Sequence, residues 1–265
     1  MNKKKGILIV SFGTSYEDTR EKTITAIENT IRHAHPDIPV YTAWTSKIIM
    51  AKLLNTTGEK IHTVSEALEQ MACDKITDVF IQTTHVINGI EFDLLKEDAM
   101  KYQNRFSSLS FGNPLISSTE DMKKIIRIIA DDFSDTLSYT ANSKDALILM
   151  GHGSEHHSNT AYAALDYMFK EIGYPNIYMG TVEAYPSIEE ILGQLKNTSV
   201  TSVHLAPFMI VAGDHANNDM AGNTNDSWAF LCKKAGYDVT CHLKGLGEYP
   251  RIHALFLEHL NAILY

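Results

Sequence analysis

Two histidines and one glutamate stand at regular spacing in the second half of the sequence, each after a stretch that is typical of a buried strand. His152 follows the apolar run 146–150, and Glu183 and His215 follow the next two such runs. Successive members lie about 30 residues apart, the length of one strand–helix unit. Two neutral imidazoles and a carboxylate form a ligand set that suits cobalt, nickel, iron or zinc. We therefore predict that His152, Glu183 and His215 are metal ligands.

The glycines on either side of His152 favour this interpretation. Gly151 and Gly153 allow the backbone to turn tightly at the end of a strand, where open α/β sheets bind their ligands. Taken singly, each residue also has a simpler explanation. A histidine in a loop is commonly an ordinary polar surface residue, and Glu183 is well placed as a carboxylate at a helix start. The occurrence of all three at successive strand ends favours the metal site.

The sequence pattern predicts that alternating strands and helices position these residues. In the first half, the predicted strands are residues 6–10, 39–44, 78–82 and 108–111, and in the second half 146–150, 176–181, 200–206 and 237–243. Helical apolar periodicity fills most of the intervals, and we expect Asp214 to cap a helix that begins at His215. Uninterrupted apolar strands are typical of a parallel sheet with both faces covered. The fold class is therefore α/β.

The two halves repeat each other. Residues 7–14 align without a gap with residues 147–154, and the Val79–Ile81 stretch aligns with Val203–Leu205. We expect two similar lobes, each a four-stranded parallel sheet flanked by helices, with a cleft between them. The polar stretch 134–144 predicts a boundary that gives lobes of residues 1–135 and 136–265. The second lobe carries the metal ligands, and we allow for its last helix to pack back on the first lobe.

The first half lacks the ligand set, although its equivalent positions are recognisable. Phe12 takes the place of His152, and Glu91 takes the place of His215. We expect Phe12 to offer an apolar face to a flat ring. His85 lies at the predicted cleft edge, where a substrate contact and a structural role are equally plausible. Thr14 belongs to a turn that weakly resembles a phosphate-binding loop. Phe12, Thr14, His85 and Glu91 are the substrate contacts that we expect.

Composition narrows the class of partner. The chain has 265 residues, 44% of them hydrophobic, and a formal net charge of −9. This acidity argues against nucleic acid or an anionic membrane as a partner. Three cysteines form neither a disulfide framework nor a Cys-x-x-Cys metal site, and no apolar run approaches the length of a membrane span. We expect a cytoplasmic protein, and the sequence leaves a homo-oligomer open.

Three motifs in the second half resemble those of a known family. They are Gly151–His157, Val182–Pro186 and Val211–Met220, and shorter matches occur at Ser11–Ser15 and Gly245–Glu248. The chain is similar to the anaerobic-pathway cobaltochelatases of the CbiK type, which belong to the class II tetrapyrrole chelatases. That resemblance implies two flavodoxin-like lobes around a cleft.

The resemblance also implies the reaction. This would be the insertion of Co²⁺, as substrate metal, into sirohydrochlorin or precorrin-2 in cobalamin synthesis, without ATP or an organic cofactor. It makes His152, Glu183 and His215 the metal ligands, with His152 and Glu183 as the catalytic residues.

Several alternatives stay open at this point. Iron or nickel insertion is compatible with the same ligands, and so is a metal or tetrapyrrole carrier that does no catalysis. A metallohydrolase is less favoured, because the sequence has no His-Glu-x-x-His motif. A histidine phosphatase would need arginine where this chain has Gly151.

Overall fold

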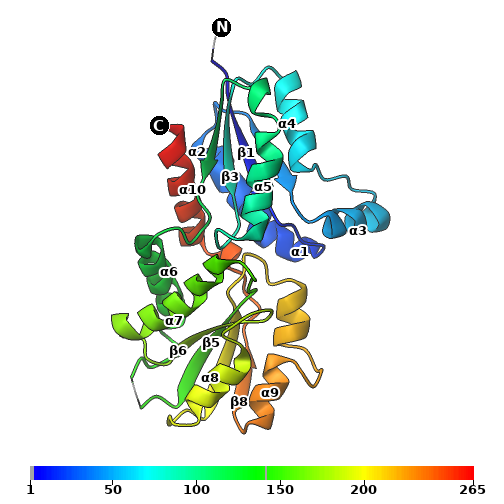
Figure 1. Ribbon diagram of the computed structural model, residues 1–265. Coiled ribbons are helices and arrows are strands. Elements are labelled where there is room, and N and C mark those ends of the chain that lie inside the picture. The colour runs from blue at the N-terminus through cyan, green and yellow to red at the C-terminus, as the bar shows by residue number, and fades with distance from the viewer. Residues whose placement is uncertain (1–2, 141) are drawn as a thin grey trace. The chain divides into compact units, whose positions relative to one another are not determined.

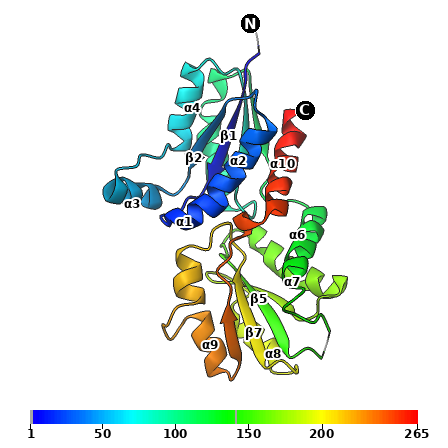
Figure 2. The ribbon, with the colours of Figure 1, turned by 180° about the vertical axis from the view of Figure 1, so that it is seen from behind.

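The computed structural model describes residues 3–140 and 142–265, and the chain divides into two compact units. The first unit runs up to Ser117 and includes Gly247–Tyr265, and the second is Ser118–Leu246. Figures 1 and 2 show the course of the chain from both sides. In the described part of the chain, no helix is both long and apolar enough to cross a membrane.

The first unit contains a four-stranded parallel sheet in the order β2-β1-β3-β4. Its strands are β1 (Lys5–Ser11), β2 (Val40–Trp44), β3 (Asp78–Thr83) and β4 (Ser108–Gly112). Its helical segments are α1 (Glu17–Arg20), η1 (Glu21–Thr25), α2 (Ala26–Ala34), α3 (Lys47–Thr57), α4 (Val64–Cys73), α5 (Ile90–Met100), η2 (Gln103–Arg105) and α10 (Pro250–Leu264). Helix α10 packs on β3, β4 and α2, so the end of the chain completes the unit in which it began.

The second unit has the same topology, with strand order β6-β5-β7-β8. Its strands are β5 (Asp145–Gly151), β6 (Ile177–Thr181), β7 (Ser202–Pro207) and β8 (Asp238–Cys241). Its helical segments are α6 (Thr119–Asp132), η3 (His157–Asn159), α7 (Thr160–Ile172), α8 (Ile188–Leu195), η4 (Ala216–Met220) and α9 (Trp228–Lys234), and η5 (Leu246–Glu248) begins at its last residue. The predicted four-stranded parallel sheets, one in each half of the chain, are confirmed.

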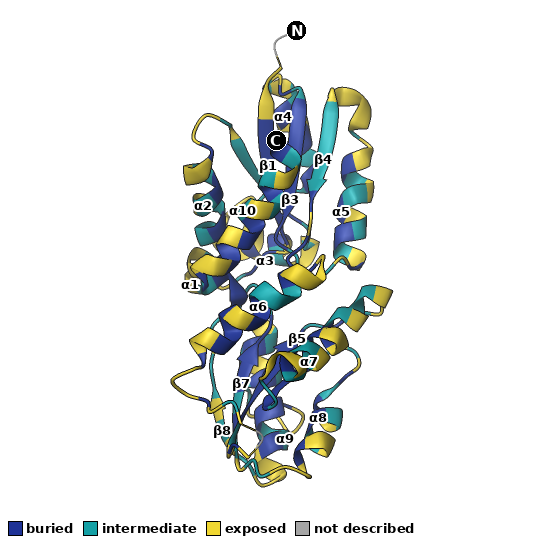
Figure 3. Ribbon diagram, turned by 90° about the vertical axis from the view of Figure 1, so that its left-hand side faces the viewer, coloured by how far each residue is buried: buried dark blue, intermediate teal, exposed yellow. Residues whose placement is uncertain are grey.

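Both sheets are buried on their two faces, as the uninterrupted apolar strands require. Figure 3 shows the central strands β1, β3, β5 and β7 as largely buried. In the second unit, Ile148 and Leu205 pack with Ile191 of α8 and Trp228 of α9. Each fully buried side chain of this size contributes about 1.5–3 kcal/mol through the removal of apolar surface from water. The cores therefore hold the strand ends in fixed positions.

The strand registers of the two sheets match the internal alignment. Gly6 of β1 is paired with Val79 of β3, and Ala146 of β5 is paired with Val203 of β7. These are the pairs that the alignment of the two halves makes equivalent. The duplication therefore extends to the hydrogen-bonding register of the strands.

The division between the units differs from the boundary expected at residue 135. Helix α6 packs against α7 of the second unit, so the chain leaves the first unit before α6 begins. The stretch 134–144, read as a linker from its polarity, is tied to the second unit where it is described. Leu137 is buried, and the Ser138 carbonyl accepts a hydrogen bond from Asn176. These contacts hold the stretch on the second unit although its composition is polar.

Two helices of the second unit begin directly after a serine. Helix α8 begins after Ser187, whose hydroxyl and Glu190 form a capping box. Helix α9 begins at Trp228, after the capping residue Ser227. In both cases a serine that can bond free backbone N–H groups sets the start.

Candidate metal centre

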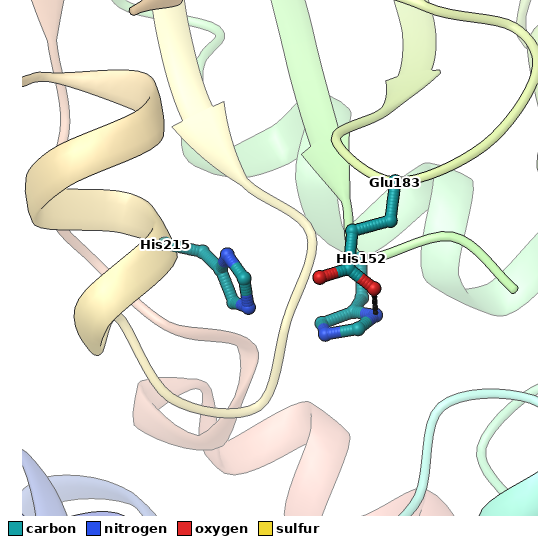
Figure 4. A group of neighbouring side chains, drawn as sticks. All are labelled: His152, Glu183 and His215. Atoms are coloured by element: carbon teal, nitrogen blue, oxygen red, sulfur yellow. Dashed lines mark ion pairs between the residues drawn. The ribbon is translucent and has the colours of Figure 1, made fainter. Parts of the chain in front are cut away.

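The three predicted ligands come from the loops that follow β5, β6 and β7. Because these strands are neighbours in one parallel sheet, their carboxyl ends meet at the same edge. His152 comes directly after β5, Glu183 lies just beyond β6, and His215 precedes the short π-helix η4. Figure 4 shows the three side chains converging from these loops.

The distances within this group fit a shared metal ion. One potential ligand atom from each of His152, Glu183 and His215 lies within 4.8 Å of the other two, and no other such group occurs among the described residues. The two imidazole centroids are 4.7 Å apart with perpendicular planes, and His152 Nδ1 is 3.5 Å from Glu183 Oε2. Two atoms bound to one metal at about 2.1 Å can be at most about 4.2 Å apart. Tetrahedral coordination places bound atoms about 3.4 Å apart, so a pair at the 4.8 Å limit would have to close by about 1.4 Å to hold an ion.

All three ligand side chains remain accessible. The exposed fractions of the His152, Glu183 and His215 side chains are 43%, 55% and 33%. Three protein ligands at an accessible rim leave coordination positions for water or a substrate. This arrangement suits an ion that enters and leaves the site.

The backbone ties the loops of His152 and Glu183 together. Beyond the last ladder pair, Val182 N–H donates to the Gly151 carbonyl at 3.0 Å, and Glu183 N–H donates to the His152 carbonyl at 2.9 Å. The β5–β6 ladder thus continues through the first two ligands. Their separation is set by backbone hydrogen bonds as well as by side-chain rotamers.

Glycines 151 and 153 are required by the packing around them. Gly153 has φ of +91°, and a Cβ there would lie 2.9 Å from both the nitrogen and the Cβ of Ala184. A Cβ on Gly151 would lie 2.5 Å from the ring of Tyr162. A side chain at Gly153 would push apart the two loops that carry His152 and Glu183, and a side chain at Gly151 would displace Tyr162 of α7. The Gly-His-Gly motif is therefore a close-packing requirement of the site.

Residues missed in the sequence analysis support the ligands. Asp219 Oδ2 lies 2.7 Å from His215 Nδ1, a contact that the four-residue spacing within one motif could have indicated. Tyr162 of α7 is buried beside Gly151, and burial raises the pKa of its hydroxyl to about 12, so it remains a neutral packing residue. Asp214 does not cap the turn at His215 as expected. Its Oδ1 accepts a hydrogen bond from Asn218 instead.

The four expected substrate contacts lie in the first unit. Phe12 is 43% exposed, whereas Thr14 is buried and its hydroxyl accepts a hydrogen bond from Tyr16 N–H. Glu91 is half-buried in the first turn of α5. Their contact with a substrate stays a prediction.

His85 has an unusual environment just beyond β3. The Thr83 hydroxyl lies 2.5 Å from its Nδ1 and also accepts the His85 backbone N–H. Its Nε2 is buried and has no hydrogen-bond partner in the described structure. Burial lowers the pKa of this imidazole to about 4. His85 is therefore uncharged at neutral pH.

The first unit repeats the backbone of the metal centre without its ligands. Ser46 N–H donates to the Phe12 carbonyl at 3.1 Å, which is the counterpart of the Glu183–His152 contact. Gly13, with φ of +105°, is pressed against Trp44 as Gly153 is pressed against Ala184. Phe12 and Ser46 thus occupy the places of His152 and Glu183.

The family of the chain follows from comparison with known proteins. A model of the family described as cobalt chelatase (CbiK) matches residues 5–265. The chain belongs to this family. The sirohydrochlorin cobaltochelatase of Salmonella typhimurium is 39% identical over 261 residues, covering 98% of this chain and 97% of the relative. The sirohydrochlorin cobaltochelatase CbiKC of Nitratidesulfovibrio vulgaris is 31% identical, covering 98% and 90%. The family expected from the motifs is confirmed.

Solved structures of chelatases share the fold of this cobalt chelatase. SirB from Bacillus subtilis, solved with Fe³⁺, gives a TM-score of 0.67 at 15% identity, covering 97% of this chain and 94% of that protein. CbiX, described as the terminal enzyme of siroheme biosynthesis in denitrifying bacteria, gives 0.60 at 15% identity, covering 97% and 98%. At this identity the likeness concerns the fold alone, and it confirms the chelatase-like architecture of two α/β lobes.

Replacing Gly153 with alanine should weaken Co²⁺ binding by about tenfold or more, because the new Cβ separates the His152 and Glu183 loops. Gly173→Ala is the matched control. Gly173 also has a positive φ, of +110°, but nothing lies within 4 Å of its Cβ position. Both variants should lose about 1–2 kcal/mol of stability from the left-handed backbone. Co²⁺ titration and denaturant unfolding measure the two effects, and equal Co²⁺ affinity in both variants would contradict the packing argument.

Burial of His85 should make the stability of the protein fall as the pH decreases from about 6.5 to about 4. In this window the unfolded chain takes up a proton at a free histidine, whereas the folded chain does not. This part of the free energy of unfolding is fully present above the pKa of histidine in the unfolded chain. On the order of 2 kcal/mol of it is lost when the pH falls to about 4. Denaturant unfolding of His85→Gln at several pH values should show a shallower dependence than wild type. The exposed His33→Gln serves as control, and an unchanged slope in His85→Gln would refute this assignment.

Proposed function

We propose that the chain catalyses the ATP-independent insertion of Co²⁺ into sirohydrochlorin, or into precorrin-2, during anaerobic cobalamin synthesis. The observation that carries this proposal is the convergence of His152, Glu183 and His215 at one strand edge. Two relatives that align over nearly their full lengths are named for this reaction. Together they favour a chelatase with the metal as its substrate.

The ligand chemistry suits a metal that is passed on. Imidazole and carboxylate bind divalent first-row ions without the strong preference that thiolates would impose. The ligands are partly exposed, so a tetrapyrrole nitrogen can reach an open coordination position. Replacement of water ligands by ring nitrogens can then proceed while protein ligands still hold the ion.

The proton balance of the reaction assigns roles to two of the ligands. Insertion of one Co²⁺ into the free ring releases two pyrrole N–H protons. In the proposed mechanism His152 releases the ion and accepts one proton, and Glu183 offsets the charge of the ion and accepts the other. These two residues lie next to each other, with 3.5 Å between Nδ1 and Oε2. His215 serves as a metal ligand until the ring nitrogens have taken over the ion.

The substrate contacts belong to the same proposal. Phe12 offers an exposed aromatic face for the ring, and Thr14, His85 and Glu91 are the further contacts that we propose on the first unit.

The cytoplasm is the proposed location, with no ATP, no organic cofactor and neither nucleic acid nor a membrane as partner. Insertion of iron or nickel would use the same ligand set, and so would a carrier that does no catalysis. The experiment below distinguishes these functions from cobalt insertion.

The visible absorbance of sirohydrochlorin, followed with Co²⁺, Fe²⁺ or Ni²⁺ in turn, tests the proposal. Wild type should convert an excess of ring and Co²⁺ over many turnovers, and His152→Ala should lower the rate by about 100-fold or more. His157→Ala changes an exposed histidine of the same loop and should leave the rate within about twofold. Conversion that stops at one ring per chain would indicate a carrier, and a preference for iron or nickel would replace cobalt as the substrate.

A further inference from the structure

The two histidine ligands differ in what their second ring nitrogen contacts. His215 Nδ1 lies 2.7 Å from a carboxylate oxygen of Asp219. His152 Nδ1 lies 3.0 Å from the carbonyl oxygen of the adjacent Gly153, and its nearest carboxylate is Glu183, itself a predicted ligand. A carboxylate that is outside the ligand set therefore supports His215 but not His152.

The Asp219 contact determines which nitrogen of His215 faces the metal. An ionised carboxylate only accepts hydrogen bonds, so Nδ1 must carry the hydrogen. Nε2 then keeps its lone pair for the ion. Figure 4 shows one ring nitrogen of His215 directed toward His152 and Glu183, which is the orientation that this tautomer requires. Such outer carboxylates orient metal-binding histidines and increase their strength as ligands.

The backbone holds Asp219 in place. His215 and Asp219 lie one turn apart across η4, whose residues Ala216 and Met220 are fully buried in the core. The Asn217 side chain donates to the Gly213 carbonyl at 2.7 Å, which fastens the turn to the loop after β7. The carboxylate and the imidazole therefore face each other from a rigid turn.

We propose that Asp219 is a positioning residue that holds His215 as the fixed anchor for the metal, so that His152 is the ligand that exchanges during transfer. This inference rests on the proposed function, because it assumes that His215 binds Co²⁺. It assigns different duties to the two histidines. His215 retains the ion while His152 alternates between the ion and the incoming ring.

Two variants of Asp219 test this assignment by Co²⁺ binding in the absence of tetrapyrrole. Asp219→Ala removes the acceptor and should weaken Co²⁺ binding by about 10- to 100-fold, as measured by the visible absorption of bound Co²⁺. Asp219→Asn keeps a neutral acceptor and should fall between the alanine variant and wild type. Asp214→Asn removes a charge from the adjacent turn and should change the affinity by less than about twofold, since its Oδ1 accepts a hydrogen bond from Asn218, which the amide oxygen can still accept.

Long-range ¹H–¹⁵N NMR of the metal-free protein gives a second readout. The His215 ring should carry its hydrogen on Nδ1 in wild type and should lose this preference in Asp219→Ala. Unchanged Co²⁺ affinity or an unchanged tautomer in Asp219→Ala would overturn the positioning role. His215→Ala tests separately whether His215 binds Co²⁺ at all. If His215→Ala binds Co²⁺ as tightly as wild type, then the assignment of His215 as a ligand fails. If His215→Ala loses Co²⁺ binding but Asp219→Ala does not, then only the inference about Asp219 is rejected.

Discussion

The candidate metal centre depends on the continuation of backbone pairing between β5 and β6 beyond the ends of the strands. The hydrogen bond from Glu183 N–H to the His152 carbonyl joins the first two ligands through their main chains. It can form only because Gly153 adopts a positive φ and brings no Cβ against Ala184. The buried sheet holds these loops, so the ligand positions are largely determined before any metal arrives. The third predicted ligand, His215, follows the neighbouring strand on the other side of β5.

The first unit shows that this scaffold is separable from the chemistry it carries. Its strands have the same order and register, and its first two loops are joined by the same hydrogen bonds. Phe12 and Ser46 nevertheless stand where His152 and Glu183 would be. The duplicated backbone thus carries the predicted ligands in one unit and other side chains in the other. The identity of a few loop residues, rather than the fold, distinguishes the two units.

The sequence predicted the strands and the clustering of His152, Glu183 and His215 because their signals are local. Apolar runs identify buried strands, and glycines beside His152 mark a tight turn at a strand end. The division of the chain depends on distant contacts, and so it was misplaced. The polar stretch 134–144 gave no sign that Leu137 is buried, and α6 carries an apolar face that either unit could have covered. Asp219 was overlooked because its four-residue spacing from His215 indicates a contact only where the two residues share a helical turn, as they do at η4.

The right-angle arrangement of the two imidazole planes has a consequence for any planar molecule that reaches this edge. A disc that lies parallel to one of these rings necessarily stands upright with respect to the other. A macrocycle that lies parallel to one imidazole therefore meets the face of that ring and the rim of the other. A flat molecule that approaches this edge therefore contacts two different surfaces, and its tilt determines which imidazole nitrogen it reaches first.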